Sequence, residues 1–148
     1  MKKTLLMLAA MAALFACKKA DEPVVNPGTT QFVGSVWVEY QGQEYENENI
    51  AVDFILSEDK KAADVQINQI RFVPQMPVTV DTVIPVTVSS NGNALTFTAQ
   101  DNIYPHSPAG VEQTKYQVTS LKGTVTGQEL SFSLNFGPYP TRFSGKKN

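Results

Sequence analysis

The sequence predicts an all-β domain in which about eight antiparallel strands form a meander, closed into a small barrel or a half-open barrel. Apolar side chains recur at every second position in most stretches from residue 32 onward, whereas no window keeps a helical spacing over three turns. Short segments that contain Gly, Pro or Asn separate these stretches. A sandwich of two sheets is the alternative, because it also buries one face of every strand.

Four stretches carry an apolar residue at every second position, and in two of them every intervening residue is polar. Their apolar rows are Val36, Val38 and Tyr40; Ile50, Val52, Phe54 and Leu56; Leu95, Phe97 and Ala99; and Leu130, Phe132, Leu134 and Phe136. Asn91 and Gly92 precede the third row, and this dipeptide favours the positive φ angles of a tight hairpin turn. Each row therefore predicts a strand with one buried face and one solvated face.

Two further strands change phase partway along their length. Val65 and Ile67 are followed by Ile70 at the other parity, and Val118 is followed by Leu121 in the same way. One extra residue in a strand transfers its buried face to the other parity, so each change of phase predicts a β-bulge.

The remaining segments are less regular. Residues 78–88 predict a long or broken strand, and Pro85 lacks the N–H that a central ladder needs, so we expect an edge or a bend there. Gly127 marks the turn into the strand that begins at Leu130, and residues 141–144 form a short last strand. Residues 57–63 are the helical candidate, with one or two turns.

The N-terminus has the pattern of a targeting segment. Lys2 and Lys3 precede an uncharged run over residues 4–16, which is the length of a signal-peptide core and too short to span a bilayer stably. The run ends in Leu-Phe-Ala before Cys17 and resembles the bacterial lipobox, in which the Cys is acylated and becomes the new N-terminus. The alternative is an ordinary signal peptide beside a chance Cys.

This resemblance divides the chain into a lipoprotein signal peptide at residues 1–16, a flexible tether at residues 17–31 and the barrel domain at residues 32–148. Two or three acyl chains on Cys17 hold a protein firmly at a membrane, since each buried methylene contributes about 0.8 kcal/mol. Residues 18–22, Lys-Lys-Ala-Asp-Glu, resemble signals that send some Gram-negative lipoproteins outward. We therefore expect an outer-membrane protein that faces the cell surface; a merely solvated tether is the alternative reading of these residues.

A resemblance to the bacterial calycin-like, or lipocalin-like, lipoproteins rests on several motifs. They are the lipobox, the tether, Gly34-Ser35-Val36-Trp37 in the first strand, and the closing residues 121–127 and 130–134. The resemblance implies a small barrel that binds a lipid or another hydrophobic molecule and has no established catalytic residues. In lipocalins a late Arg packs across the Trp of the first strand. Arg142 is the candidate for that partner of Trp37, and an exposed arginine at a strand edge is the alternative.

Several kinds of chemistry are excluded or disfavoured. A single Cys excludes intramolecular disulfides, multi-Cys zinc sites and iron–sulfur clusters. His106 is the one imidazole, it lies between prolines, and no Gly-x-Ser-x-Gly motif is present, so we expect neither an enzyme nor a cofactor. Glu44, Glu46 and Glu48 share one parity, but nothing matches a calcium loop, and we expect a solvated face without a metal.

Charge also limits the partners. The chain has 12 Lys and Arg residues against 14 Asp and Glu residues, and the basic residues form no clustered stripe. Nucleic acid is therefore not an expected partner, because its recognition needs concentrated positive charge. We expect a monomer.

Aromatic residues near strand ends are the candidate ligand contacts, because such rings combine an apolar body with a polar tip. They are Trp37, Tyr40, Tyr104, Tyr116, Phe136 and Tyr139. The first hypothesis is a small hydrophobic ligand inside the barrel. The second is an adhesion or recognition module in which the outer surface and the Pro-stiffened loops bind a glycan or a protein. Sequence does not separate them, because a strand's apolar face looks the same in a packed core and in a cavity.

Overall fold

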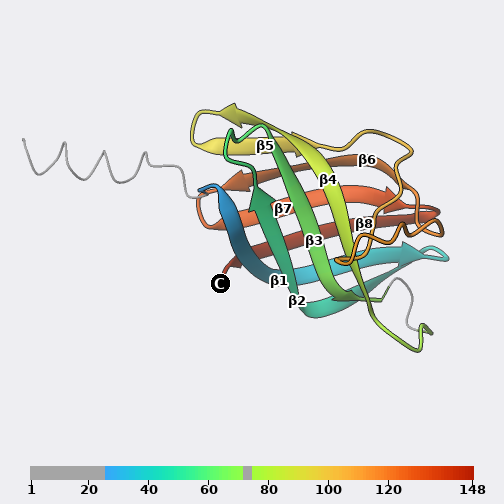
Figure 1. Ribbon diagram of the computed structural model, residues 1–148. Coiled ribbons are helices and arrows are strands. Elements are labelled where there is room, and N and C mark those ends of the chain that lie inside the picture. Colours follow the sequence, from blue (N-terminus) through green and yellow to red (C-terminus); the bar gives the residue numbers. More distant parts are fainter. Residues whose placement is uncertain (1–25, 72–74) are drawn as a thin grey trace, which may run out of the picture.

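The computed structural model describes residues 26–71 and 75–148, and it contains one closed β-barrel (Figure 1). The strands are β1 (Gly28–Tyr40), β2 (Gln43–Leu56), β3 (Ala62–Ile70), β4 (Val80–Asn91), β5 (Ala94–Thr98), β6 (Val118–Thr126), β7 (Glu129–Phe136) and β8 (Tyr139–Lys147). Each strand pairs antiparallel with the next, and β8 pairs with β1. The predicted eight-stranded meander is confirmed, and the barrel is closed. The predicted signal peptide and Cys17, its predicted site of acylation, lie outside the described residues.

The first strand begins four residues before the predicted domain boundary at residue 32. Gly28 pairs with Leu56 and Gln31 with Asp53, so the end of the predicted tether extends the β1–β2 ladder. The Gln31 side chain donates to Asp53 Oδ1 at 3.0 Å. The polar side chains of residues 28–31 predicted a tether. Their backbone groups nevertheless pair with the long strand β2, and this pairing needs no apolar side chain.

The interior is filled by side chains from all eight strands. The largest residues with less than 2% exposure are Phe32, Phe54, Phe97, Phe136, Phe143, Ile67, Ile70, Ile84, Leu130, Val36 and Val38. The Phe97 ring lies 5.3 Å from Phe54 and 6.3 Å from Phe132, between ring centroids, and Phe132 stacks on Phe143 at 5.2 Å. The predicted apolar rows turn inward and form a single core.

Two inward-facing glycines make room for these rings. A Cβ atom at Gly123 would lie 2.4 Å from Phe97 Cζ, and one at Gly145 would lie 2.5 Å from Phe143 Cζ. Both distances are far below van der Waals contact. The rings of Phe97 and Phe143 thus occupy the space beside Gly123 and Gly145, and no room is left there for a side chain.

Both predicted bulges are confirmed. The β3–β4 register shifts between Ile67 and Ile70, and the β6–β7 register shifts between Thr119 and Lys122. Gln69 and Ser120, the residues with positive φ at these bulges, donate their backbone N–H to Asp81 and Asp101, respectively, at 2.8 Å. At each bulge a carboxylate thus accepts a hydrogen bond from the backbone N–H that has no partner in the interrupted ladder.

The β1–β2 pairing contains a third bulge, which the sequence did not reveal. It lies between Gly34 and Val36, with Asn49 at a φ of 56° on β2. No change of apolar parity marks it, because the residues of β2 before Ile50 are polar.

The helix predicted for residues 57–63 is wrong, because residues 57–61 form the turn between β2 and β3, and Ala62 and Ala63 begin β3. Ser57 Oγ donates to Asp59 Oδ1 at 2.6 Å, and the Lys61 N–H donates to the same oxygen at 3.0 Å. The hydrogen bond from Ser57 lowers the pKa of Asp59 below its ordinary value of 3.8, followed in size by that from Lys61. Short polar side chains favour such turns over a helix because they bond to the nearby backbone.

Pro85 lies within β4, opposite Asp64 of β3, and β4 is not an edge of the closed barrel. The ladder on its other side is interrupted, however. It ends at Thr87, and the next contact is the isolated bridge from Val83 to His106. The N–H and C=O of Val83 point toward the β5 side of β4, where they bond to His106. Pro85 lies two residues further along the strand and has the same orientation, so the N–H that it lacks would point into the gap.

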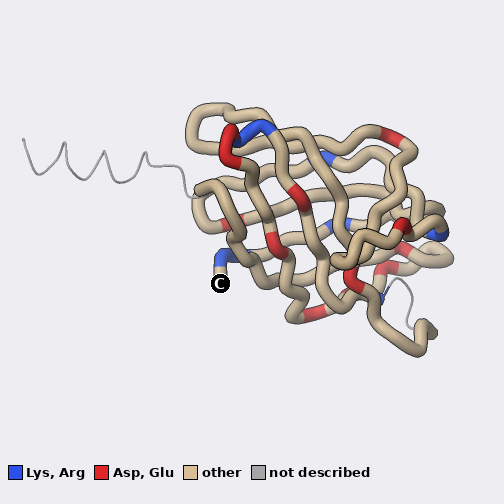
Figure 2. The backbone as a smooth tube through the Cα atoms, viewed as in Figure 1, with Lys and Arg blue, Asp and Glu red and all other residues tan. Residues whose placement is uncertain are grey.

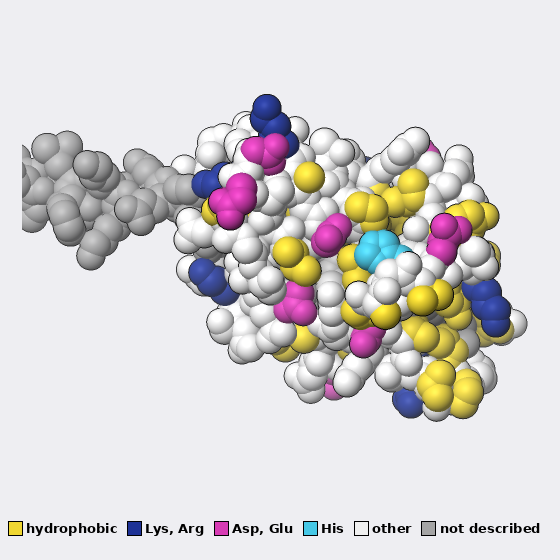
Figure 3. Space-filling model, in the orientation of Figure 1, with side chains coloured by type: hydrophobic (Ala, Val, Ile, Leu, Met, Phe, Trp, Pro, Cys, Tyr) yellow, Lys and Arg dark blue, Asp and Glu magenta, His cyan; other side chains and the backbone are white. Residues whose placement is uncertain are grey.

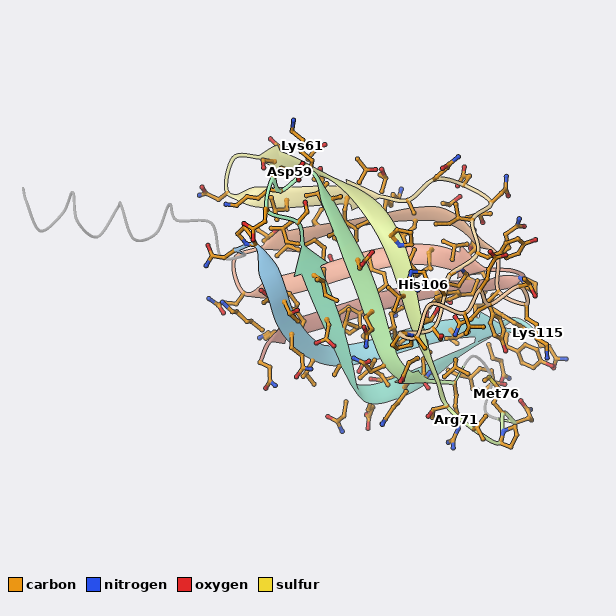
Figure 4. All side chains as sticks on the ribbon, in the orientation of Figure 1. Asp59, Lys61, Arg71, Met76, His106 and Lys115 are labelled. Carbon is orange, nitrogen blue, oxygen red and sulfur yellow. The ribbon has the colours of Figure 1, made fainter. Side chains whose placement is uncertain are left out.

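The two ends of the barrel differ. Residue 26 and the C-terminus lie at one end, with the short β2–β3, β4–β5 and β6–β7 turns (Figure 1). The other end, here called the loop end, has the β1–β2 and β7–β8 turns, the β3–β4 connection and the long segment 99–117. Figure 4 shows Asp59 and Lys61 near the first end and Arg71, Met76 and Lys115 near the loop end. The described chain, from residue 26, therefore enters the barrel opposite the longest loops.

Candidate recognition surface on the outer barrel wall

The aromatic candidates do not converge on one site. Phe136 is fully buried in the core, and Trp37 is half-buried on the outer wall. Tyr40 and Tyr139 pack together at the loop end with centroids 5.8 Å apart, and Tyr45 extends this pair at 6.4 Å from Tyr40. The other two candidates also lie at this end: Tyr116 packs against the core, and Tyr104 is 42% exposed.

Four hollows stand out in the described part of the chain, and all four open to solvent. Two lie on the outer wall over β5–β8 and β1, one lies between residues 26–31 and the C-terminus, and one lies over the bulges of β2 and β3. None is lined by the core alone. The pronounced hollows are thus on the outside of the barrel.

Trp37, Arg142 and Glu44 form an ordered cluster on the outer wall. Trp37 and Arg142 are register partners on β1 and β8, and the guanidinium carbon lies 4.0 Å from the centroid of the indole ring. The predicted Trp37–Arg142 contact is confirmed. Such a contact contributes about 0.5–2 kcal/mol, depending on solvent exposure.

Glu44 reaches Arg142 from β2, across β1. Arg142 Nε donates to Glu44 Oε2 at 3.2 Å, and Nη2 donates to Oε1 at 3.0 Å. This two-point geometry fixes the plane of the guanidinium. The two side chains are 50% and 49% exposed, so the pair adds little to stability but orients the remaining N–H groups of Arg142.

The cluster borders a continuous depression, here called the outer-wall furrow. One part, of about 400 Å³, is lined by Trp37, Glu39, Glu44 and residues of β6–β8, most of which are polar. The adjoining part, of about 580 Å³, extends over β5–β8. Both parts include Lys122, Ser133 and Arg142. Each volume is in the range of small-ligand sites.

The formal charges along the furrow balance, with Glu39 and Glu44 opposite Lys122 and Arg142. The other side of the barrel is different. Figure 2 shows Asp and Glu spread over β2–β4, with few basic residues among them. The furrow therefore has no excess of formal charge, and its lining mixes polar side chains with apolar residues such as Trp37, Phe97 and Phe132.

His106 holds the long segment 99–117 against β4 through backbone hydrogen bonds. Its N–H and C=O exchange hydrogen bonds with Val83 of β4, at 3.0 and 2.8 Å, and its Nδ1 lies 2.9 Å from the carbonyl oxygen of Ser107. Gln113 adds a side-chain bond to buried Thr82 at 2.7 Å. Figure 4 shows His106 beside β4. The loop thereby closes the gap that β5 leaves on β4.

The loop end also exposes apolar side chains. Val78, Tyr104 and Val111 are 61%, 42% and 66% exposed. Figure 3 shows hydrophobic side chains gathered around His106 and toward this end. These residues come from two loops, the β3–β4 connection and the segment 99–117.

The three glutamates of one parity are not gathered into a site. Glu44 pairs with Arg142, while Glu46 accepts a hydrogen bond from Ser35 Oγ at 2.7 Å. Within residues 26–71 and 75–148, no group of three or more His, Cys, Asp or Glu side chains is placed to hold a metal ion. The same residues include no helix that could cross a bilayer.

Comparison with models of known protein families found no match, and comparison with curated proteins found none either. The closed antiparallel barrel is compatible with the calycin-like architecture. Sequence reasoning missed Glu44, Lys122 and Ser133 as furrow residues. The alternation in the sequence showed that these side chains face outward. Which outward residues become neighbours across four strands depends on the bulge positions and the strand register.

Proposed function

We propose that the protein is a lipid-anchored, non-catalytic recognition module that binds its ligand on the outer wall of a packed barrel. The filled interior carries this proposal. Five phenylalanines with at most 2% exposure occupy the space where a calycin-like internal ligand would lie. A ligand there would have to displace close-packed rings, which costs several kcal/mol.

The outer-wall furrow supports the positive part of the proposal. It combines an aromatic ring, a fixed guanidinium and several hydroxyl groups, and these are the groups that give polar ligands their orientation. Because Trp37 and Glu44 already hold Arg142, little side-chain entropy is lost when a ligand binds.

The anchor completes the proposed arrangement. Acylated Cys17 would hold the protein at the outer membrane, and the residues up to 25 would let the barrel stand away from the lipid. The chain enters the barrel at Gly28, at the end opposite the long loops. The furrow on the side wall then remains open to large molecules outside the cell.

The test compares the two places where a ligand can bind. Residues 18–148 contain all eight strands, and we expect this fragment not to bind oleate saturably. We expect it to bind an immobilised polymer from a panel of polysaccharides and extracellular proteins, and Arg142→Ala to weaken that binding about tenfold. Glu112→Ala, on the long loop, is the matched surface control. One-to-one oleate binding that Arg142→Ala leaves unchanged would overturn the proposal.

A further inference from the structure

The strand register places hydroxyl side chains in a row across the furrow. Thr96 pairs with Thr124, Thr124 with Ser131, and Ser131 with Ser144, on β5, β6, β7 and β8. All four side chains point outward and line the same hollow. We call these four residues the hydroxyl ladder.

A second row runs parallel to the ladder, two residues away on each strand. It consists of Thr98, Lys122, Ser133 and Arg142, and it continues to Trp37 on β1. The rows are separated by about 7 Å, and four neighbouring strands span about 14 Å. The two rows together form a grid of six hydroxyls and two cationic groups on one depression.

The grid favours a ligand that is itself covered with hydroxyl groups. Each Ser or Thr hydroxyl has one donor and two acceptor sites, and so does each hydroxyl of a sugar. Within the ladder the bond between Thr124 and Ser131 is long, at 3.4 Å, and so is the bond from Thr96 to the Ser89 carbonyl oxygen. Such weak bonds are readily exchanged for shorter ones to a ligand.

Charge and topology disfavour other ligand classes. Because Glu39 and Glu44 balance Lys122 and Arg142, the furrow offers no excess charge to a polyanion. Because every strand pairs on both sides around the closed barrel, the wall presents no open sheet edge to which a peptide strand could add.

We propose that the outer-wall furrow binds a neutral oligosaccharide chain, which lies across β5–β8 on the hydroxyl ladder and ends against Trp37 and Arg142. This inference rests on the proposed function, and it adds the class of ligand. The two joined hollows extend over β5–β8 and reach Trp37 of β1, and this span of neighbouring strands is longer than one sugar ring, which favours a chain over one sugar.

Trp37 provides the assay, because it is the one tryptophan of the chain and borders the furrow. The full-length protein is reconstituted in phosphatidylcholine vesicles and titrated with soluble dextran, mannan, xylan and barley β-glucan, while its fluorescence is recorded. Alginate is the anionic comparator. We expect at least one neutral polysaccharide to change the fluorescence saturably, and alginate to change it less.

Ser131→Tyr tests the ladder, because a bulky ring on this exposed position obstructs the middle of the row. We expect affinity to fall about tenfold. Ile55→Tyr, outward on β2 and outside the furrow, is the matched control and is expected to bind as the wild type does. Unchanged unfolding temperatures for both variants show that the barrel is intact.

The outcomes separate the two proposals. Neutral polysaccharides that bind equally well to Ser131→Tyr, or alginate that binds more tightly than all of them, would overturn the oligosaccharide proposal. A protein ligand that is lost in Arg142→Ala, with no polysaccharide bound, would overturn it as well but support outer-wall recognition. Binding that Arg142→Ala leaves unchanged would overturn the proposed function itself.

Discussion

Gly123→Ala tests how tightly the barrel interior is packed. The added Cβ would lie 2.4 Å from Phe97 Cζ, 2.5 Å from Phe132 Cβ and 2.7 Å from Phe97 Cε2. Overpacking of this kind costs about 1–3 kcal/mol. The φ of Gly123 is not in the left-handed region, so the cost comes from the contacts and not from backbone strain.

The expected loss is a large share of a small domain's stability. With a total of about 5–15 kcal/mol, a decrease of about 2 kcal/mol lowers the unfolding temperature by roughly 4–10 °C. Urea unfolding followed by far-UV circular dichroism measures the change directly, because the midpoint falls while the slope stays the same.

Phe97→Leu supplies the matched background, since leucine lacks the ring atoms Cζ and Cε2 that the new methyl group meets. Phe132 Cβ stays in place, so relief should be partial. We expect Gly123→Ala to cost about 0.5–2 kcal/mol less in the Phe97→Leu protein than in the wild type. Equal costs in the two backgrounds, or a neutral Gly123→Ala, would refute the reasoning that these rings are closely packed.

Three further predictions concern the surface and the anchor. Arg142→Ala should destabilise the protein by less than about 1 kcal/mol, as scored by urea unfolding, yet shift the tryptophan emission to longer wavelength, because the ring loses its cover. Asp59, whose folded pKa is lowered, stabilises the fold above pH 3.8 and progressively less below it; Asp59→Asn should therefore flatten the loss of stability on acidification in pH-dependent melts. Cys17→Ser should abolish palmitate labelling in cells, and persistent labelling would remove the proposed anchor.

Much of the fold could be predicted because period-two alternation is a local signal. The rows that contain Phe54, Phe97 and Phe132 predicted inward faces, and the parity changes near Ile70 and Leu121 predicted two bulges. Barrel closure could not be predicted in this way. It depends on whether β8 returns to β1, and the same alternating strands also suit a sandwich.

The candidate recognition surface was harder to predict, because it is made of register partners from distant parts of the chain. Lys122, Ser133, Arg142 and Trp37 stand in one row only after the bulges near Ser120 and Gly34 set the strand offsets. Parity alone could have separated two of the aromatic candidates.

Those two candidates are Trp37 and Phe136. Trp37 alternates with Val36 and Val38, so it had to face outward, while Phe136 belongs to the inward row of Leu130. A single grouping by residue type placed them together, whereas the two-residue period of a strand assigns them to opposite faces.

The central claim is that ligand binds outside a filled barrel, and amide chemical shifts of the labelled protein test it most directly. Titration with the tightest polysaccharide should move the amide signals of Lys122, Ser131, Ser133 and Arg142, while those of Phe54 and Phe97 stay in place. Large shifts at Phe54 and Phe97, with the furrow residues unchanged, would contradict the account, because they would show that the ligand enters the interior.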